Sequence, residues 1–443
     1  MLKTEITNNN AWANLHKIVF RFFFIYFLLY IAPWTWIFDL PIPGFETISN
    51  FYSACIDWFV NAANKYFFHV RPVLVPTNGS GDTSFGWAQV CLFLSLAIFG
   101  TTVWTLLNIR RKNYTLLDYW FRTIIRYNLA MIAMGYGLAK VFLSQMSFPT
   151  ESLLSTNLGD LLPMRLSWLF IGYSAPYEIF AGVMEIIAAV LLLNRKTITF
   201  GLFVATGVFI HVMVLNLCYD IPVKIFSIHL VLYCLYLLAN DFKRLWNFLV
   251  INKTTPPNTL YELRLDTKRK RIYRIVIKTL IIAAFFIFPF WTSLTGFLER
   301  DLKNKKSIFG EGIYNVQTFV LNNKDTIPIL ARDTLVWKDI IFPKKFGSGS
   351  IGSRDTVFLQ SYGRGYFSYK IDTVNHTLLM IKKSNFWGDS VSSISARYAI
   401  IDSNKFKLWT KIRNDSVYVE FVKSNRHFQL AERQFHWLSE YNR

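Results

Sequence analysis

Apolar runs of about 20 residues, the length that crosses the hydrocarbon core of a bilayer, recur through the first 291 positions of this 443-residue chain. Hydrophobic residues make up 53% of the chain and charged residues only 17%, a balance that excludes an ordinary soluble enzyme. The sequence therefore predicts a polytopic α-helical membrane domain over residues 1–294. Its seven predicted spans are residues 17–38, 86–108, 122–145, 175–194, 199–218, 222–240 and 273–293.

Basic residues gather on one side of this predicted topology, and the chain as a whole has a formal charge of +20. Cytoplasmic loops carry an excess of Lys and Arg, so the loops that contain Arg110, Arg195, Lys243 and 268–274 are predicted to be cytoplasmic. The N-terminus then lies inside the cell, and everything after about residue 294 lies outside it. Anionic lipid accounts for the basic run at 268–271 without any nucleic acid.

Two further segments of the membrane domain are predicted to lie at the outer surface. Residues 47–67 have apolar side chains at helical spacing with Asp57, Asn61 and Lys65 between them, which favours an amphipathic helix on the interface. An eighth spanning helix is the alternative, at the cost of burying those polar groups. Residues 146–174 are irregular and contain a short apolar stretch, typical of a half-buried helix or a cap on the outer face.

The composition changes at about residue 295, where alternation of apolar and polar residues replaces helical periodicity. Short turn sequences separate the alternating runs, so residues 295–443 are predicted to form an all-β antiparallel domain, either a small barrel or a sandwich, outside the membrane. The predicted strands are residues 312–320, 355–359, 366–371, 377–381, 405–412 and 417–422.

Four ionisable side chains within the predicted spans are candidate catalytic groups, because a charge inside a bilayer is costly and usually functional. At about 1.5 Å per residue they lie roughly 8 to 15 Å below the outer end of their helices, close enough in depth to form one polar layer. Such a layer predicts a polar pocket in the outer leaflet, with a lysine opposing a glutamate and two histidines moving protons. The four are Lys140, Glu185, His211 and His229.

Five neighbouring residues are candidate substrate-binding groups: Glu178, Asn216, Tyr219, Asp220 and Lys224. For several of these nine candidate residues, a purely structural role is the alternative to a functional one. Lys140 can extend its ammonium group to the surface, Glu178 can serve the N-terminal dipole of its helix, and Asp220 with Lys224 can hold a turn. Either histidine can be a buried packing residue. No H-x-x-x-H or H-E-x-x-H spacing is present, so no metal site is predicted.

Other chemical signatures are missing from the sequence. The four cysteines, at 55, 91, 218 and 234, are widely separated and include no C-x-x-C pair. There is no dinucleotide, P-loop or nucleophile-elbow motif either. The residues alone leave open whether the protein is an enzyme.

The region 120–245 resembles the DoxX-like membrane proteins of Bacteroidota-type bacteria. The similarity is carried by Gly135-Tyr-Gly-Leu-Ala-Lys140, Glu178-Ile-Phe-Ala-Gly182-Val-Met-Glu185 and Asn216-Leu-Cys-Tyr219-Asp220-Ile-Pro222-Val-Lys224 with His229. The resemblance implies a bacterial cytoplasmic (inner) membrane protein with a periplasmic C-terminal domain. It also implies a link to quinone redox chemistry, which makes a quinone one candidate, although the sequence identifies no cofactor. A weaker similarity is to the transmembrane domain of vitamin K-dependent carboxylases, in which Lys140 would be the base.

Two functions compete on this evidence. The first is a redox or quinone-linked membrane component that handles a lipid-soluble small molecule in the outer-leaflet pocket. The second is a non-catalytic cell-envelope scaffold whose β domain binds a periplasmic or membrane protein. A chemical site requires the polar groups to lie within mutual reach, whereas a scaffold predicts charges that are individually capped. The expected partners are the lipid bilayer and either the lipid-soluble small molecule or the partner protein. Nucleic acid is not expected.

Overall fold

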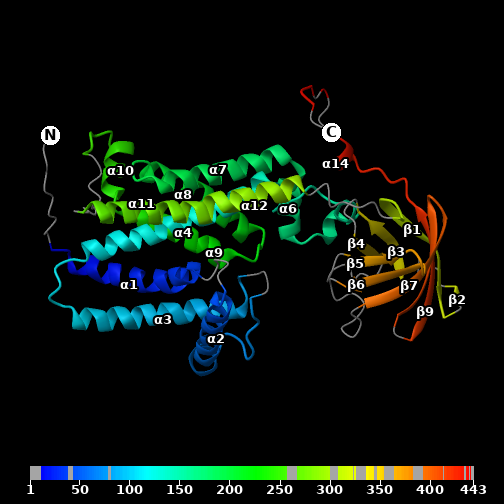
Figure 1. Ribbon diagram of the computed structural model, residues 1–443, viewed down its shortest axis with the longest axis horizontal. Helices are drawn as coiled ribbons and strands as arrows, with labels where there is room; N and C mark the ends of the chain where they lie inside the picture. The colour runs from blue at the N-terminus through cyan, green and yellow to red at the C-terminus, as the bar shows by residue number, and fades with distance from the viewer. Residues whose placement is uncertain are drawn as a thin grey trace. The chain divides into compact units, whose positions relative to one another are not determined.

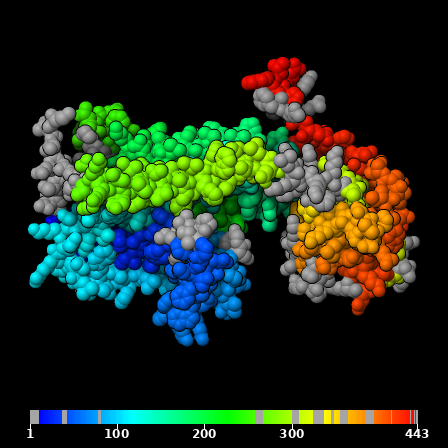
Figure 2. All heavy atoms as spheres, viewed as in Figure 1, coloured from blue at the N-terminus to red at the C-terminus, as the bar shows by residue number. Residues whose placement is uncertain are grey.

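The computed structural model describes residues 11–37, 43–77, 81–256, 267–299, 308–322, 324–325, 336–343, 347–353, 364–382, 393–412, 414–433, 436–438 and 440. The chain divides into two compact units, drawn with all their heavy atoms in Figure 2. One consists of Met1–Gln145 and Glu178–Ser293, and the other of Met146–Tyr177 and Leu294–Arg443. The segment between two helices of the first unit thus folds with the C-terminal unit.

Helices form the first unit (Figure 1). Apolar residues make up most of these segments, β-branched ones included, as expected of helices that face lipid or each other. They are α1 (Asn14–Ile31), α2 (Phe45–Ala63), α3 (Ser84–Leu107), α4 (Thr115–Val141), α7 (Ala175–Leu193), α8 (Ile198–Cys218), α9 (Lys224–Ala239), α10 (Phe242–Leu249), α11 (Lys268–Ile282) and α12 (Phe288–Leu298), with η1 (Pro33–Ile37), η2 (Asn64–Phe68) and η4 (Ala283–Ile287) beside them.

Five helical segments of the described chain are long and apolar enough to cross a membrane: Asn14–Trp36, Ser84–Leu107, Ala175–Leu193, Ile198–Cys218 and Lys268–Leu298. A sixth arises if α9 and α10, which meet at an 80° bend, are counted as one broken span. The predicted count of seven is therefore not confirmed. The predicted span 122–145 lies on α4, which carries Asp118, Arg122, Arg126 and Lys140 and is less apolar than the others.

The predicted amphipathic segment at 47–67 is helical and corresponds to α2 and η2. Figure 1 shows α2 crossing the direction that α1 and α3 share. Val60 packs with Ala88 of α3 in a small buried cluster, while Phe51 and Trp58 are exposed. One face of α2 thus holds the helix on the bundle and another carries bare aromatic rings, the pattern of a helix at a membrane interface.

The second unit contains a closed antiparallel barrel (Figure 1). Its strands are β1 (Gly312–Leu321), β3 (Trp337–Phe342), β4 (Ser348–Ser353), β5 (Gly365–Asp372), β6 (Thr377–Lys382), β7 (Ser393–Asp402), β8 (Lys405–Ile412) and β9 (Asp415–Lys423). Each pairs with the next along the chain, and β1 also pairs with β9, from Tyr314 opposite Lys423 to Leu321 opposite Val417. The short strand β2 (Lys324–Asp325) pairs antiparallel with the end of β1.

The barrel confirms the predicted antiparallel β domain and decides for a barrel over a sandwich. The predicted strand at 355–359 lies outside the described residues. Strict alternation turns every second side chain of β8 inward, so that Phe406 and Leu408 are buried. Aromatic rings fill the interior, and Phe406 stacks on Phe421 with 4.8 Å between ring centroids. Apolar side chains therefore occupy the centre of the barrel as a packed core.

The segment 146–177 forms α5 (Glu151–Leu154), η3 (Leu158–Asp160) and α6 (Pro163–Tyr173). It joins the barrel through a buried polar cluster: the Ser152 hydroxyl lies 2.7 Å from the Ser350 hydroxyl on β4. Arg364 donates to the same Ser350 oxygen at 3.0 Å and pairs with Asp339 of β3. We call Ser152, Asp339, Ser350 and Arg364 the strap cluster. All four side chains are buried, so the outward face of β3 and β4 is covered here.

Candidate functional site in the helical unit

Lys140 and Glu185 form a buried ion pair. The Nζ atom of Lys140, near the end of α4, lies 2.9 Å from each carboxylate oxygen of Glu185 on α7. Lys140 is only 7% exposed and Glu185 only 2%. A lone charge at either position would be strongly unfavourable, and the symmetrical contact compensates both charges at once. The predicted opposition of these two residues is thus present in the structure.

Two glycines let α4 and α7 approach closely enough for this pair. A Cβ atom on Gly137 would lie 2.8 Å from the Gly182 carbonyl oxygen, and one on Gly182 would lie 2.6 Å from the Gly137 carbonyl oxygen. Any side chain at either position would force the helices apart. Because Gly137 precedes Lys140 by one turn and Gly182 precedes Glu185 by one turn, the same contact brings the two charged side chains together.

Glu178 lies on the same face of α7 as Glu185, two turns closer to the start of the helix. It is buried in the first helical turn, where the helix dipole stabilises a carboxylate. This position agrees with the structural explanation offered for Glu178 from the sequence.

His229, on α9, is the centre of a second polar group. Its Nδ1 atom lies 2.6 Å from the backbone carbonyl oxygen of Ile225, so that nitrogen must carry the hydrogen. Its Nε2 atom lies 2.7 Å from the Tyr26 hydroxyl, and the two are hydrogen-bonded. The Tyr30 ring stacks on the imidazole with centroids 3.7 Å apart. We call Tyr26, Tyr30 and His229 the His229 cluster.

Asp82 secures the start of α9 from far away in the sequence. Its carboxylate accepts hydrogen bonds from the backbone N–H groups of Lys224, at 2.7 Å, and Ile225, at 2.9 Å. These are free donors at a helix N-terminus, and a carboxylate is their best acceptor. Lys224 extends its ammonium group to Asp220 at 2.7 Å, with Asp82 at 3.7 Å. The predicted Asp220 and Lys224 thus act on the structure of this turn.

The remaining predicted residues lie apart from these groups. His211 is exposed on α8, and Tyr219, which directly follows that helix, is also exposed. Asn216 is buried on the same helix. Within the described chain, the predicted polar layer is therefore divided between the Lys140–Glu185 pair and the His229 cluster, with His211 at the surface.

Sequence reasoning missed Tyr26, Tyr30 and Asp82. The two tyrosines lie four residues apart in an aromatic run of the first apolar segment, where one aromatic residue looks like any other. Asp82 lies two residues before α3 and could only be read as a local cap, because the helix that it caps begins 142 residues later. No local pattern records such a contact.

Neither group has the composition of a metal centre. Across the part of the chain that the structure describes, no three His, Cys, Asp or Glu side chains gather closely enough to hold an ion. The four cysteines are free thiols, and Cys234 is buried. What the helical unit offers chemically is a compensated ion pair and an imidazole hydrogen-bonded to a phenolic hydroxyl.

Comparison with known proteins gives one informative match. The chain is 34% identical over 125 residues to the uncharacterized protein YwoB of Bacillus subtilis, a stretch that covers 76% of YwoB and 28% of this chain. No family model and no solved structure matches the chain.

Proposed function

We propose that this chain, which belongs to the same family as the uncharacterized protein YwoB of Bacillus subtilis, is a multi-pass protein of the bacterial cytoplasmic membrane that acts as a non-catalytic envelope scaffold. In this proposal the helices hold the barrel on the periplasmic side, with the N-terminus in the cytoplasm. The resemblance of residues 120–245 to DoxX-like proteins implies the same membrane. The basic loops between the helices support the orientation.

The observation that carries the scaffold function is the pairing of Lys140 with Glu185. A catalytic charge inside a membrane must be available to a substrate, whereas both oxygens of Glu185 are engaged by one ammonium group. Lys224 and Asp220 are likewise bonded to each other. Capped charges of this kind are expected of a protein whose helices anchor and position another domain.

A second candidate function, a redox or quinone-linked role, is favoured by the His229 cluster. Quinone reduction consumes protons, and a phenol bonded to an imidazole is a pair through which a proton can move. Tyr26 and His229 form such a pair, buried and stacked against Tyr30. The outer-leaflet pocket proposed from the sequence would then lie at this cluster, with a lipid-soluble quinone as its ligand.

One set of purifications distinguishes the two. Wild-type protein, Tyr26→Phe/His229→Gln and Lys140→Met/Glu185→Leu are purified in detergent, and each is analysed by native mass spectrometry, organic extraction and absorption spectroscopy. The scaffold function predicts no stoichiometric quinone in any of them. Quinone that is present in the wild type, lost from the Tyr26/His229 variant and kept by the Lys140/Glu185 variant would replace the scaffold with the redox function.

Topology is tested separately. A cysteine at Ser393, exposed at the start of β7, is introduced into a chain whose own four cysteines are serine. Intact cells are treated with a membrane-impermeant maleimide. Labelling of intact cells supports a periplasmic barrel, and labelling only after the membrane is permeabilised contradicts it.

A further inference from the structure

The outward face of the barrel at β1, β8 and β9 carries an unusual set of side chains. Alternation places Lys405, Lys407 and Trp409 of β8 on this face, and the same rule places Tyr418, Glu420 and Val422 of β9 beside them. The strand register shows that these residues are neighbours. Val422 lies opposite both Lys405 and Asn315, and Tyr418 lies opposite Trp409. We call these residues, with Gln317, the outer strip.

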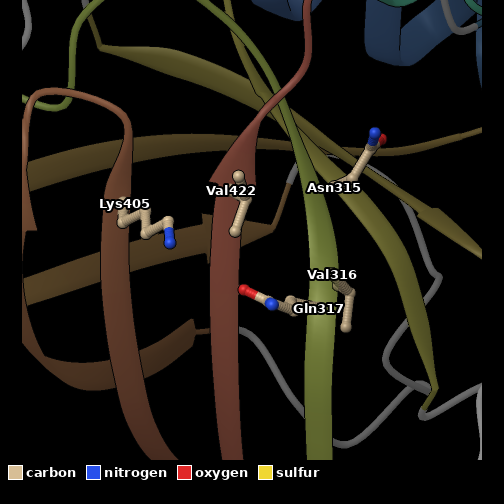
Figure 3. A pocket seen from close by; sticks show the side chains of 5 residues that line it. All are labelled: Asn315, Val316, Gln317, Lys405 and Val422. Carbon is tan, nitrogen blue, oxygen red and sulfur yellow. The ribbon is translucent and has the colours of Figure 1, made fainter.

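One end of the outer strip is a shallow pocket of about 310 Å³, lined by Asn315, Val316, Gln317, Lys405 and Val422. Figure 3 shows Gln317 reaching from β1 toward β9, with Lys405 on the far side of β9. Gln317 and Lys405 thus point toward β9 from opposite sides, with Val422 between them, whereas Asn315 points away from β9. Polar groups that converge on a partly apolar hollow are the usual composition of a small-ligand site.

An irregularity in β1 creates this pocket. The register with β9 shifts between Val316 and Thr318, so Gln317 is the extra residue of a β-bulge. Because of the bulge, Gln317 and Thr318 both lie on the outward side, while Phe319 returns to the core. Bulges that redirect a side chain in this way are common beside binding sites.

The other end of the outer strip is aromatic. Trp409 is 42% exposed, and its ring lies 5.4 Å from that of Tyr418, centroid to centroid. At about 3.3 Å per residue, Trp409 lies about 13 Å along β8 from Lys405. An elongated ligand of that length could touch the indole and the pocket together.

An internal ion pair occupies the middle of the outer strip. Lys407 lies 2.8 Å from Glu420, and Thr318 and Tyr418 also donate to that carboxylate. The charge of Glu420 is therefore already satisfied. Lys405 adds a further cation at the pocket, so the outer strip favours a neutral or moderately acidic partner.

We propose that the outer strip binds a carboxylate-bearing amino-sugar glycan, the chemistry of the bacterial cell-wall polymer. The indole of Trp409 stacks on the C–H face of one sugar ring. The amide of Gln317 bonds hydroxyl and acetamido groups, and Lys405 pairs with a sugar carboxylate. This inference rests on the proposed function, because only a periplasmic barrel meets that polymer.

A protein partner fits the outer strip less well. Protein interfaces concentrate their binding energy in apolar, desolvated centres. Here the centre is an ion pair bonded within itself, and the apolar residues of the pocket are only Val316 and Val422. A flat, polar face with an exposed indole matches a glycan, whose rings each present one apolar face and a rim of hydroxyl groups.

The test is co-sedimentation of the full-length protein, in detergent, with purified insoluble cell-wall glycan. We expect saturable binding by the wild type, about tenfold weaker binding for Trp409→Ala and for Gln317→Ala, and substantial recovery in Trp409→Phe. Trp437→Ala is the matched control, since Trp437 is 92% exposed after the last strand and should bind like the wild type. Equal melting temperatures show that the variants are folded.

Three outcomes overturn the inference. The first is that the wild type does not sediment with the glycan. The second is that Trp409→Ala and Trp437→Ala lose glycan binding equally. The third is that a photo-cross-linker at Lys405 captures a protein in intact cells while the glycan does not bind. Failure of the proposed topology is seen separately in the maleimide experiment. If Ser393→Cys is labelled in intact cells and glycan does not bind, only the glycan inference is lost.

Discussion

The Ser152 and Ser350 hydroxyl groups lie 2.7 Å apart although 198 residues separate them in the chain. Ser152 belongs to α5, in the connection between α4 and α7, and Ser350 belongs to β4 of the barrel. The strap cluster therefore joins the barrel to the segment between α4 and α7. These are the helices that carry Lys140 and Glu185.

Cysteines at these two positions should form a disulfide. With all four native cysteines replaced by serine, Ser152→Cys/Ser350→Cys is expected to cross-link without added oxidant if both residues face the periplasm, because that compartment is oxidising. Non-reducing electrophoresis after cleavage between the two positions reports the bond. Ser152→Cys/Ser393→Cys is the control and should stay reduced. Equal cross-linking of both pairs would refute the contact.

Loss of one member of the Lys140–Glu185 pair should destabilise the protein more than loss of both. Lys140→Met or Glu185→Leu leaves an uncompensated buried charge and should cost about 3–5 kcal/mol, whereas the double variant should be close to the wild type or more stable. Thermal unfolding of full-length protein in detergent measures the difference. Asp220→Leu and Lys224→Met form the control pair, and at that exposed site the coupling should be about 0–1 kcal/mol. Additive effects of Lys140→Met and Glu185→Leu would contradict the ion pair.

The close contact between α4 and α7 predicts a sharp contrast between two glycines of one helix. Gly137→Ala places a methyl group 2.8 Å from a backbone oxygen of α7 and should lower the melting temperature. Gly135→Ala, two residues earlier, meets nothing within 4 Å and should raise helix stability by up to about 1 kcal/mol. Thermal unfolding of the two variants compares them directly. Similar behaviour of the two would show that the helices do not approach at Gly137.

The barrel should lose stability in acid partly through Glu420. Its pKa is lowered, chiefly by the hydrogen bond from Lys407 and then by that from Tyr418. A carboxyl group with a lowered pKa contributes stability above its unfolded pKa, and that contribution is lost as the pH falls through the folded value. Glu420→Gln should therefore reduce the dependence of the melting temperature on pH below about pH 4.5. Lys407→Met should have a similar effect in that range, because it removes the first cause of the shift. An unchanged acid profile in Glu420→Gln would contradict the network.

Several parts of this architecture could be predicted locally. The positions of α3, α7 and α8 follow from long apolar runs, and the strands of the barrel follow from period-two alternation, as in β8. Similar depth in the membrane predicted that Lys140 could oppose Glu185, but it predicted His211 and His229 in the same layer equally well. Prediction was less successful for α4, whose four charged residues make its composition ambiguous between a span and a buried helix.

Contacts between distant segments were not predictable. The sequence around Asp82 does not indicate that it caps α9, and the sequence around Ser152 does not indicate that it contacts the barrel. The outer strip depends on the pairing of β1 with β9 and on a bulge at Gln317, neither of which local alternation encodes.

The sequence by itself determined the two classes of structure in this protein, because hydropathy and its period act residue by residue and need no partner. Only the tertiary structure decided which polar groups meet. It paired Lys140 with Glu185 at the Gly137–Gly182 contact, directed His229 to Tyr26, and left His211 at the surface. The physical reason is that a buried charge requires a partner but does not specify one, and helix packing and barrel closure make the choice.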